Sequence, residues 1–352
     1  MAWLRRPAEA HYTADAHEAG STGNRQMDQR SLLEQLIAGP HSGVALARAR
    51  GVSRAAIWKA IEGLRAAGVD IDSRAGHGYV LSQPLELLDR EHILHGLPTA
   101  VRGQLAGLEV RWSVDSTNSA LLREETPPMA GCRVLLAECQ TVGRGRRGRI
   151  WRSPLAAHLY LSCARRFEGG LGRLGGLSLV AGVAVARALH GLGFMQIRLK
   201  WPNDLVFEDA GRLHKLGGLL VEGSGEQAGH ARAVIGLGLN VRMPAAEAAR
   251  IDQPWCDLAT LAAAPPSRNA LAAAVLAELL PALERFERDG LHPSLEAYRA
   301  LDALQDREVQ IHDNDGDWSG RALGLSAEGG LRVATTGGER IVHAADVSLR
   351  LA

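Results

Sequence analysis

The 352-residue sequence has few aromatic residues, few cysteines and almost no net charge. Because Phe, Trp and Tyr make up only 4% of the residues, a folded core has to be built mainly from Ala, Leu and Val. The four cysteines form no CxxC pair, which argues against a disulfide scaffold and favours reduced thiols in a cytosolic protein. The net charge of +1 means that any contact with nucleic acid must come from local clustering of charge.

Long apolar segments are also missing. The longest apolar run, residues 174–186, has 13 residues and contains glycines, so we expect a buried helix there. A membrane span needs about 20 residues. The first 26 residues lack the apolar stretch of a signal peptide and predict a disordered extension, with Met27 as an alternative translation start. We therefore expect a cytoplasmic protein that makes no contact with a membrane.

The remaining sequence predicts three ordered parts, in an α+β fold. Residues 27–82 contain three short helical patterns followed by a glycine-centred hairpin, the outline of a winged helix-turn-helix. Residues 83–300 interleave strand-like alternation with helices of uneven spacing, which is typical of a mixed sheet. Residues 301–352 contain short strands separated by glycine-containing turns, which predicts a small β-barrel.

The N-terminal part carries a candidate DNA-binding surface. Ser31 and Glu34 form a capping-box pattern that predicts the start of the first helix. From His41 to Ala75 the sequence has six Lys or Arg and three acids, a local excess of positive charge. A third helix in such a fold can enter the major groove, and the candidate residues are Ser53, Arg54, Trp58, Lys59 and Arg65. The alternative is a winged helix that serves domain packing without binding DNA.

Residues 143–149 contain four arginines and three glycines between two apolar strands. Glycines let the backbone approach a ligand, and guanidinium groups bind phosphate oxygens in pairs. Because four like charges repel one another, we expect the empty loop to be mobile. The alternatives are a solvated basic loop and an RNA-binding arginine tract, although such tracts usually lie in disordered tails.

Two lysines are placed where an anion could meet the edge of a sheet. Lys200 ends a predicted strand and precedes Trp-Pro-Asn-Asp204, while Lys215 enters a strand whose next residues include two glycines. An ordinary turn and a β-bulge are the alternatives. Residues 115–118, Asp-Ser-Thr-Asn, mark a strand-to-helix junction whose polar side chains can cap the helix or bind a small polar group.

Other common signatures are absent from the sequence. The 13 histidines are scattered without companion ligands, so we expect no dedicated metal site. No P-loop is present, so bound ATP would not be held by a Walker-type cradle. Residues 236–240 resemble a dinucleotide glycine motif only superficially, and a glycine-containing strand is the better interpretation.

Taken in order, residues 116–118, Gln140 with 143–149, 200–205, 215–219 and 236–240 resemble the successive motifs of biotin–protein ligases. With the helix-turn-helix, the chain is similar to the bifunctional type that combines ligase and biotin operon repressor. The resemblance covers residues from about 30 to 350. It implies a winged helix, a central domain related to class II aminoacyl-tRNA synthetases, and an SH3-like C-terminal barrel.

The resemblance also implies an activity. The family joins biotin to ATP, with Mg²⁺, to form biotinyl-5′-AMP, and then transfers biotin to a lysine of a biotin carboxyl carrier protein. A repressor of this type would bind operator DNA as a homodimer when adenylate is bound. The competing hypotheses are a lipoate-type ligase, and a ligand-sensing transcription factor without turnover.

The site residues follow from the same resemblance. The expected catalytic residues are Lys200, Arg146 and Lys215. The expected biotin-binding residues are Ser116, Thr117, Asn118, Gln140, Gly143, Arg144, Trp151, Lys215, Gly217 and Gly218. The expected ATP and adenylate residues are Arg146, Arg147, Arg149, Lys200, Asn203, Asp204 and Asn240. One departure is Leu323, which stands near the place of the family's nucleotide-contacting arginine in the last domain, with Arg321 close by.

Overall fold

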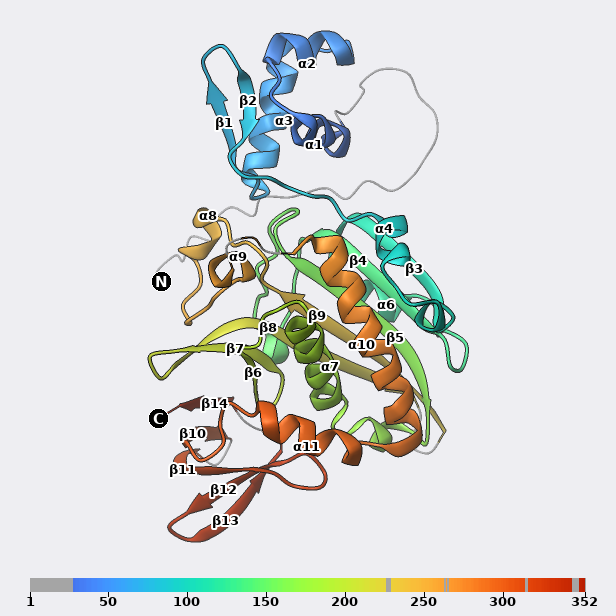
Figure 1. Ribbon diagram of the computed structural model, residues 1–352, viewed down its shortest axis with the longest axis vertical. Helices are drawn as coiled ribbons and strands as arrows, with labels where there is room; N and C mark the ends of the chain where they lie inside the picture. Colours follow the sequence, from blue (N-terminus) through green and yellow to red (C-terminus); the bar gives the residue numbers. More distant parts are fainter. Residues whose placement is uncertain are drawn as a thin grey trace, which may run out of the picture.

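The computed structural model describes residues 28–225, 229–262, 264, 266–313, 316–343 and 348–351. The extension expected at residues 1–26, and Met27 after it, lie outside these described residues. A helical module with a small hairpin stands at one end of the molecule, a large α/β part in the middle and a small β-sheet at the other end (Figure 1).

The N-terminal module is the winged helix-turn-helix that the sequence predicts. Its helices are α1 (Gln29–Ala38), α2 (Gly43–Arg50) and α3 (Arg54–Ala66), and its wing is the antiparallel pair β1 (Ile71–Arg74) and β2 (Gly78–Leu81). The apolar stripe of α3 packs on the leucines of α1 in one buried cluster. This cluster holds the three helices together and leaves the opposite face of α3 in solvent.

The predicted start of the first helix was wrong. Helix α1 begins at Gln29, and its N-cap is Asp28, whose carboxylate accepts the Arg30 N–H at 3.0 Å. Ser31 lies inside the helix, where its hydroxyl accepts a hydrogen bond from Arg50. An aspartate is as good an N-cap as a serine. The capping-box pattern of Ser31 and Glu34, which begins three residues after Asp28, therefore could not identify the first residue of the helix. Ser42 caps α2 by accepting the Ala45 N–H.

The central part is built on one seven-stranded mixed sheet. The strand order is β3-β4-β5-β9-β8-β7-β6, with β3 parallel to β4 and the other pairs antiparallel. The strands are β3 (Leu105–Val114), β4 (Cys132–Gln140), β5 (Leu159–Glu168), β6 (Ile197–Lys200), β7 (Asp204–Asp209), β8 (Arg212–Gly225) and β9 (His230–Leu239). Strand β7 was not predicted, because only its first residue, Asp204, was interpreted, as part of the turn after Lys200.

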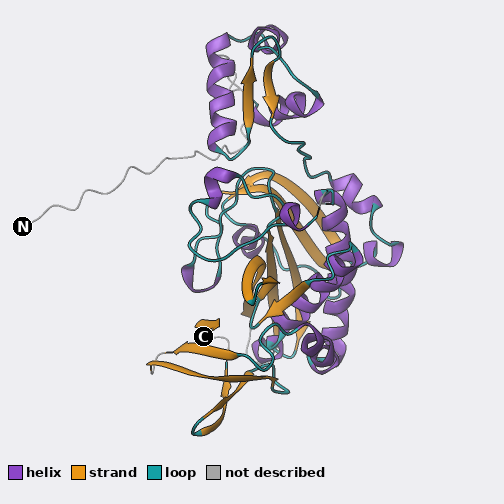
Figure 2. Ribbon diagram, turned by 60° about the vertical axis from the view of Figure 1, so that its left-hand side comes forward, coloured by secondary structure: helices purple, strands orange, loops and turns teal. Residues whose placement is uncertain are grey.

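Helices cover both faces of this sheet. The longer ones, α7 (Leu177–Gly191) and α10 (Arg268–Asp289), pack together on one side, which Figure 2 shows clearly. Helix α6 (Thr117–Arg123) packs on the other side through a smaller buried cluster. The remaining helical segments are α4 (Arg90–His95), α5 (Thr99–Arg102), η1 (Arg146–Gly148), η2 (Leu171–Leu174), α8 (Ala245–Ala248), α9 (Leu258–Leu261) and α11 (His292–Leu301).

The apolar run at residues 174–186 forms most of α7, a core helix, as predicted. Within the described residues, Leu171–Gly191 is the one segment long and apolar enough to cross a membrane, and most of it is buried inside the protein. Its neighbours are α10 and the sheet, so burial in the core explains its composition.

The N-terminal module contacts the central part through a short segment before β5. Leu155 and Ala156 belong to the same buried cluster as the core of the winged helix. The Leu155 N–H donates to the Ala67 carbonyl at 2.7 Å, directly after α3. The segment after β2, which connects the two parts, is held to the central part by Arg268. This arginine forms a buried ion pair with Glu138 at 2.6 Å and also donates to the Glu86 carbonyl of the connecting segment.

The C-terminal part is the small β domain that the sequence predicts. Its antiparallel strands have the order β13-β12-β11-β10-β14, and they are β10 (Glu308–Asp313), β11 (Gly316–Leu325), β12 (Leu331–Thr335), β13 (Gly338–Val342) and β14 (Ser348–Leu351). Between β10 and β11, residues 314 and 315 lie outside the described residues. The Trp201 indole N–H donates to the Gly329 carbonyl at 3.0 Å, which connects this domain to the turn after β6.

Candidate active site

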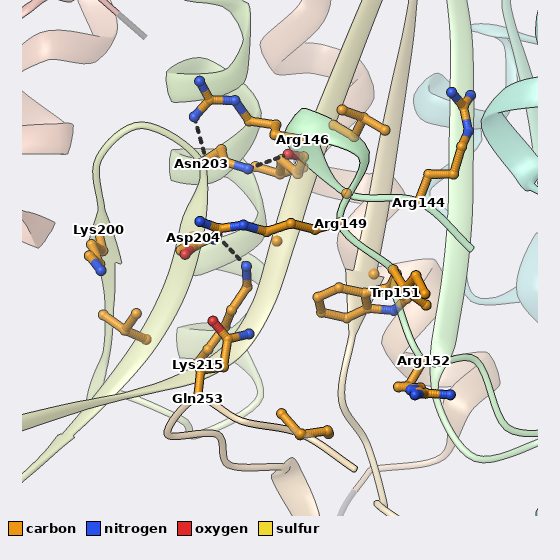
Figure 3. Close-up of a pocket in the computed structure, with 18 of the residues that line it drawn as sticks. Arg144, Arg146, Arg149, Trp151, Arg152, Lys200, Asn203, Asp204, Lys215 and Gln253 are labelled. Atoms are coloured by element: carbon orange, nitrogen blue, oxygen red, sulfur yellow. Dashed lines mark hydrogen bonds and ion pairs between the residues drawn. The ribbon is translucent and has the colours of Figure 1, made fainter. Parts of the chain in front are cut away.

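A cavity of about 1170 Å³ lies over the middle of the central sheet. Its walls come from the start of α6, the arginine loop (residues 143–149), the turn 200–204, the β7–β8 hairpin and the segment 250–254. Most of the residues singled out in the sequence therefore converge on one space. One end is lined by uncharged polar side chains, which we call the neutral end. The other is lined by arginines and lysines, the cationic end, and Figure 3 labels several of these cations.

The neutral end is built from the start of α6 and the end of β4. The Gln140 side-chain oxygen accepts the Thr117 N–H at 2.9 Å, one of the backbone donors that a helix start leaves free. The Gln140 amide donates in turn to Ser153 at 3.1 Å. Ser116, Thr117 and Asn118 are all nearly buried. These contacts fix the polar groups before any ligand arrives.

A second layer holds Asn118 from behind. Its amide donates to the Leu220 carbonyl at 3.1 Å and to the Glu222 carboxylate at 2.8 Å. Arg144 also pairs with Glu222, at 3.1 Å. Arg144 was expected to bind the ligand, whereas Glu222 was not predicted to have a role, since a single acid near the end of a strand carries no signal of its own.

Two glycines of β9 make room for these side chains. A Cβ at Gly236 would stand 2.2 Å from the Asn118 side-chain oxygen, and a Cβ at Gly238 would stand 2.5 Å from the Trp151 ring. Both residues line the cavity. The interpretation of 236–240 as a glycine-containing strand was correct, and the reason for the glycines is contact with residues that lie 87 to 118 positions earlier.

Trp151 forms the wall between the two ends of the cavity. Its ring lies 5.6 Å from the Lys215 ammonium, a cation–π distance. Its buried indole N–H has no hydrogen-bond partner within the described part of the chain. A flat apolar surface with one free donor suits a ligand that is mostly apolar and carries a hydrogen-bond acceptor.

The cationic end contains an ion pair and two hydrogen bonds of Asn203. The Lys215 ammonium lies 2.7 Å from the Asp204 carboxylate, and both side chains are about four-fifths buried, at 19% and 21% exposed. Asn203 donates to the Leu219 carbonyl at 2.7 Å and accepts from Arg146 at 3.3 Å. The turn 200–204 is thus fixed to β8 on one side and to the arginine loop on the other.

The arginine loop is folded over this end, with a single helical turn at η1. Arg147 adopts a left-handed conformation, φ 57°, which a residue with a side chain seldom takes. Burial lowers the pKa of the Arg146 guanidinium, and the neighbouring Asp204 carboxylate acts in the opposite direction. An arginine remains protonated in proteins, so Arg146 is a partly desolvated cation. An anion that reached it would therefore be bound strongly.

Lys200 and Arg149 also line the cavity. Figure 3 shows Lys200 at the opposite side from Trp151, with Asp204 and Lys215 between them in that view. The expected mobility of the empty loop stays a prediction.

Three of the expected site residues do not line the cavity. Gly143 packs against the Trp151 carbonyl and Gly217 against the Gly238 carbonyl, where a Cβ would come within 2.4 and 2.8 Å. Asn240 is buried, and its amide donates to the Cys256 carbonyl at 3.1 Å. These residues shape the strands that carry the site. Conversely, Arg152, Gln253 and the β7–β8 hairpin line the cavity although no sequence pattern pointed to them.

The candidate DNA-binding residues separate into two groups. Arg54, Trp58 and Lys59 are exposed on α3, and Ser53 caps that helix through the Ala56 N–H. Arg65 instead donates to the Ile71 carbonyl at 2.9 Å, so it ties the helix to the wing. A surface groove of about 620 Å³ runs between the start of α3 and the wing, lined by Arg54, Trp58 and residues 73–75 among others.

Metal ligands are scarce around the cavity. Among the described residues, no group of three or more His, Cys, Asp or Glu could hold a metal ion. The Asp204 carboxylate at the cationic end is already paired with Lys215.

Three family models match successive parts of the chain. Residues 28–80 match an HTH domain, residues 111–240 the biotin/lipoate A/B protein ligase family, and residues 306–350 the biotin protein ligase C-terminal domain. The matches follow the three parts of the structure.

Whole proteins show the same similarity. The chain is 40% identical over 312 residues to the bifunctional ligase/repressor BirA of Escherichia coli (strain K12), covering 89% of this chain and 94% of that protein. It is 29% identical over 313 residues to the protein of the same name from Bacillus subtilis (strain 168), covering 88% and 93%. Among solved structures, the biotin protein ligase of Aquifex aeolicus in complex with biotin and ATP aligns with a TM-score of 0.60 and 26% identity, covering 70% of this chain and all of that one.

Proposed function

The chain belongs to the family of bifunctional biotin–protein ligases and repressors, and from this premise we propose how its cavity performs the two steps of the reaction. It is an ATP-dependent biotin–protein ligase. The observation that carries the assignment of residues is the single cavity with an uncharged polar end, an aromatic wall and a cationic end. Biotin has a neutral cyclic urea, an apolar chain and a carboxylate in the same order.

In the first step, a carboxylate oxygen of biotin attacks the α-phosphorus of ATP, and pyrophosphate leaves. Two anions have to approach each other, so cations already in place lower the barrier. Lys215 stands between Trp151 and the turn 200–204, where the carboxylate would arrive. Arg146, Arg149 and Lys200 line the space for the phosphates. The neutral end, with Thr117 and Gln140, would bind the urea.

In the second step, the amine of a carrier lysine attacks the carbonyl carbon of biotinyl-5′-AMP, an amide forms and AMP leaves. Until then the mixed anhydride has to be kept from water. The arginine loop covers the cationic end and is held there by the Arg146–Asn203 hydrogen bond. This contact makes the loop the natural lid over the intermediate.

Mg²⁺ would enter with the nucleotide. Magnesium usually binds through substrate phosphates and one or two carboxylates, and Asp204 is a carboxylate in the cationic end. When bound, the ion would offset negative charge on the phosphates. Asp204 itself would then be shared between Lys215 and the nucleotide.

The test of the ligase assignment is mass spectrometry of a purified biotin carboxyl carrier domain after incubation with the protein, biotin, ATP and Mg²⁺. We expect one added biotinyl group per carrier, on a single lysine, and none when lipoate replaces biotin. Addition of lipoate with equal efficiency would favour the lipoate ligase hypothesis. Absence of pyrophosphate release with both acids would favour a sensor without turnover.

The winged helix supports the repressor activity that the family name carries. We propose that the exposed side chains of Arg54, Trp58 and Lys59 meet operator DNA, and that two copies bind a palindromic site, because one small module makes few contacts. The segment from Trp151 in the cavity to Leu155 in the core of the winged helix gives the adenylate a direct route to this module.

A gel-shift titration with biotin and ATP tests the switch. We expect tighter binding and a dimer-sized complex when the adenylate forms. Binding that is indifferent to both ligands would remove the corepressor role. The reaction and the operator both belong to the cytoplasm, which is where we place the protein.

A further inference from the structure

Ser162 is a fully buried hydroxyl behind the neutral end of the cavity. It lies on β5, is 0% exposed and is absent from the cavity wall. Its oxygen is 2.7 Å from the Thr117 hydroxyl and 2.6 Å from the Asn118 side-chain oxygen. In the sheet it pairs with Gly236, which pairs on its other side with Leu220. The serine therefore stands under the two residues that begin α6.

The orientation of the Asn118 amide decides where the serine proton goes. The nitrogen of this amide faces the Leu220 carbonyl and the Glu222 carboxylate, which can only accept hydrogen bonds. The Asn118 oxygen must therefore point toward Ser162, and it also can only accept. Two oxygens 2.6 Å apart need a hydrogen between them, so Ser162 donates its one proton to Asn118.

The same count fixes the proton of Thr117. Because Ser162 has given its hydrogen to Asn118, the 2.7 Å contact between the two hydroxyls needs the hydrogen of Thr117. The Gln140 oxygen also lies near the Thr117 hydroxyl, but at the longer distance of 3.2 Å, and it already accepts the Thr117 N–H at 2.9 Å. We infer that Ser162 is a positioning residue that turns the Thr117 hydroxyl inward, so that Thr117 presents an oxygen lone pair, and no proton, to the cavity.

This polarity selects the chemistry of the ligand. A lone pair at Thr117 accepts from a ligand N–H and repels a ligand oxygen or sulfur at the same place. A cyclic urea has N–H groups on its ring, whereas the dithiolane ring of lipoate has none. The inference rests on the proposed function. It adds that Ser162 is the residue through which the neutral end selects a ligand with an N–H donor.

The experiment compares biotin with its two cyclic carbamate analogues, in each of which a ring oxygen replaces one urea N–H. The measurement is kcat/KM for acid- and ATP-dependent pyrophosphate release by the full-length protein. We expect the wild type to reject one of the analogues by at least roughly 100-fold relative to biotin. In Ser162→Ala, the Thr117 hydroxyl can rotate and donate to the ring oxygen, so that ratio should fall by about tenfold or more.

A purely structural role for Ser162 predicts another result. Loss of packing would weaken biotin and both analogues in parallel, leave the ratio unchanged, and so overturn the inference. Thr117→Val supplies a second, independent test, because it removes the hydroxyl oxygen that would accept the ligand N–H and keeps the shape of the side chain. We expect it to lose the same discrimination, and Ser162→Ala to change the ratio no further in the double variant.

If Ser162→Ala does not fold, Thr117→Val still decides, since retained discrimination in that variant contradicts the assigned polarity. Failure of the wild type to activate biotin at all would instead contradict the proposed function. The two failures are therefore distinguishable.

Discussion

The two ends of the cavity solve the problem of binding a polar ligand in opposite ways. At the neutral end, Thr117, Asn118 and Gln140 are held by hydrogen bonds to buried partners, so their geometry is complete without ligand. At the cationic end, Arg146, Arg149, Lys200 and Lys215 bring like charges together, with the Asp204 carboxylate paired to Lys215 among them.

The difference follows from the charge of each ligand group. A neutral urea gains little from electrostatics and has to find its partners already oriented, because each buried polar group left unpaired costs about 1–3 kcal/mol. A polyphosphate carries several negative charges, which offset the repulsion within a cluster of cations. If the proposed assignment holds, the neutral end can be rigid, while the cationic end gains further counter-charge when the nucleotide binds.

The largest effect should come from Lys215→Gln. Its ammonium is mostly buried, touches Asp204 and faces Trp151, at the meeting point of the two ends. Loss of such a preorganised charge costs roughly 100- to 1000-fold in rate. The measurement is kcat/KM for biotin-dependent pyrophosphate release. Lys59→Gln, on the exposed face of α3, is the matched control; a less than tenfold fall for Lys215→Gln would contradict its role.

Arg146→Gly should loosen the lid more than it slows adenylate formation. The substitution removes the hydrogen bond to Asn203, and loss of a charged hydrogen bond corresponds to roughly 10- to 100-fold in the rate at which the intermediate escapes. Escaped biotinyl-5′-AMP would label lysines of an unrelated protein, which an avidin blot detects.

Arg147→Gly is the control for this variant, since it removes a charge from the same loop at a residue whose φ of 57° suits glycine. We expect little stray labelling from it. Labelling by Arg146→Gly that stays confined to the carrier would sink the interpretation of the loop as a lid.

Gly236→Ala should damage the neutral end alone. The added Cβ would meet the Asn118 oxygen at 2.2 Å and displace the amide from Ser162 and Leu220. We expect KM for biotin to rise roughly tenfold, while KM for ATP changes little. Gly107→Ala is the matched control, because a Cβ there meets nothing within 4 Å. A rise in both KM values would show that the two ends are not independent.

The smallest effect is that of ionic strength on the unmodified protein. Raising salt from 0.05 to 0.5 M should increase KM for ATP roughly threefold, since screening weakens partly exposed charge pairs. KM for biotin should stay nearly constant, because the neutral end holds its ligand by hydrogen bonds. An equal salt dependence of KM for ATP and KM for biotin would contradict the proposed difference between the two ends.

The sequence predicted residues at both ends of the cavity, since Ser116, Thr117, Asn118 and Gln140 line it as well as the cations, but it did not predict the layer behind the neutral end. Lys200, Lys215 and the arginine loop are chemically distinctive, and charged groups beside glycines or at strand ends are visible without a structure. Ser162, Glu222 and the role of Gly236 were not visible, because a serine, an acid and a glycine inside strands have many ordinary explanations. Asn240 was assigned to the nucleotide, whereas its amide bonds the Cys256 carbonyl.

By itself the sequence determined the order of the three parts, the helices and hairpin of the N-terminal module, and which cations could meet a phosphate. These depend on local pattern, cap residues and charge, which neighbours in the chain supply. Only the tertiary structure decided how the neutral end is held, because the row of Ser162, Gly236 and Leu220 behind it comes from three strands that the sheet brings together. The direction of a hydrogen bond depends on every partner around it, and here those partners are far apart in the chain.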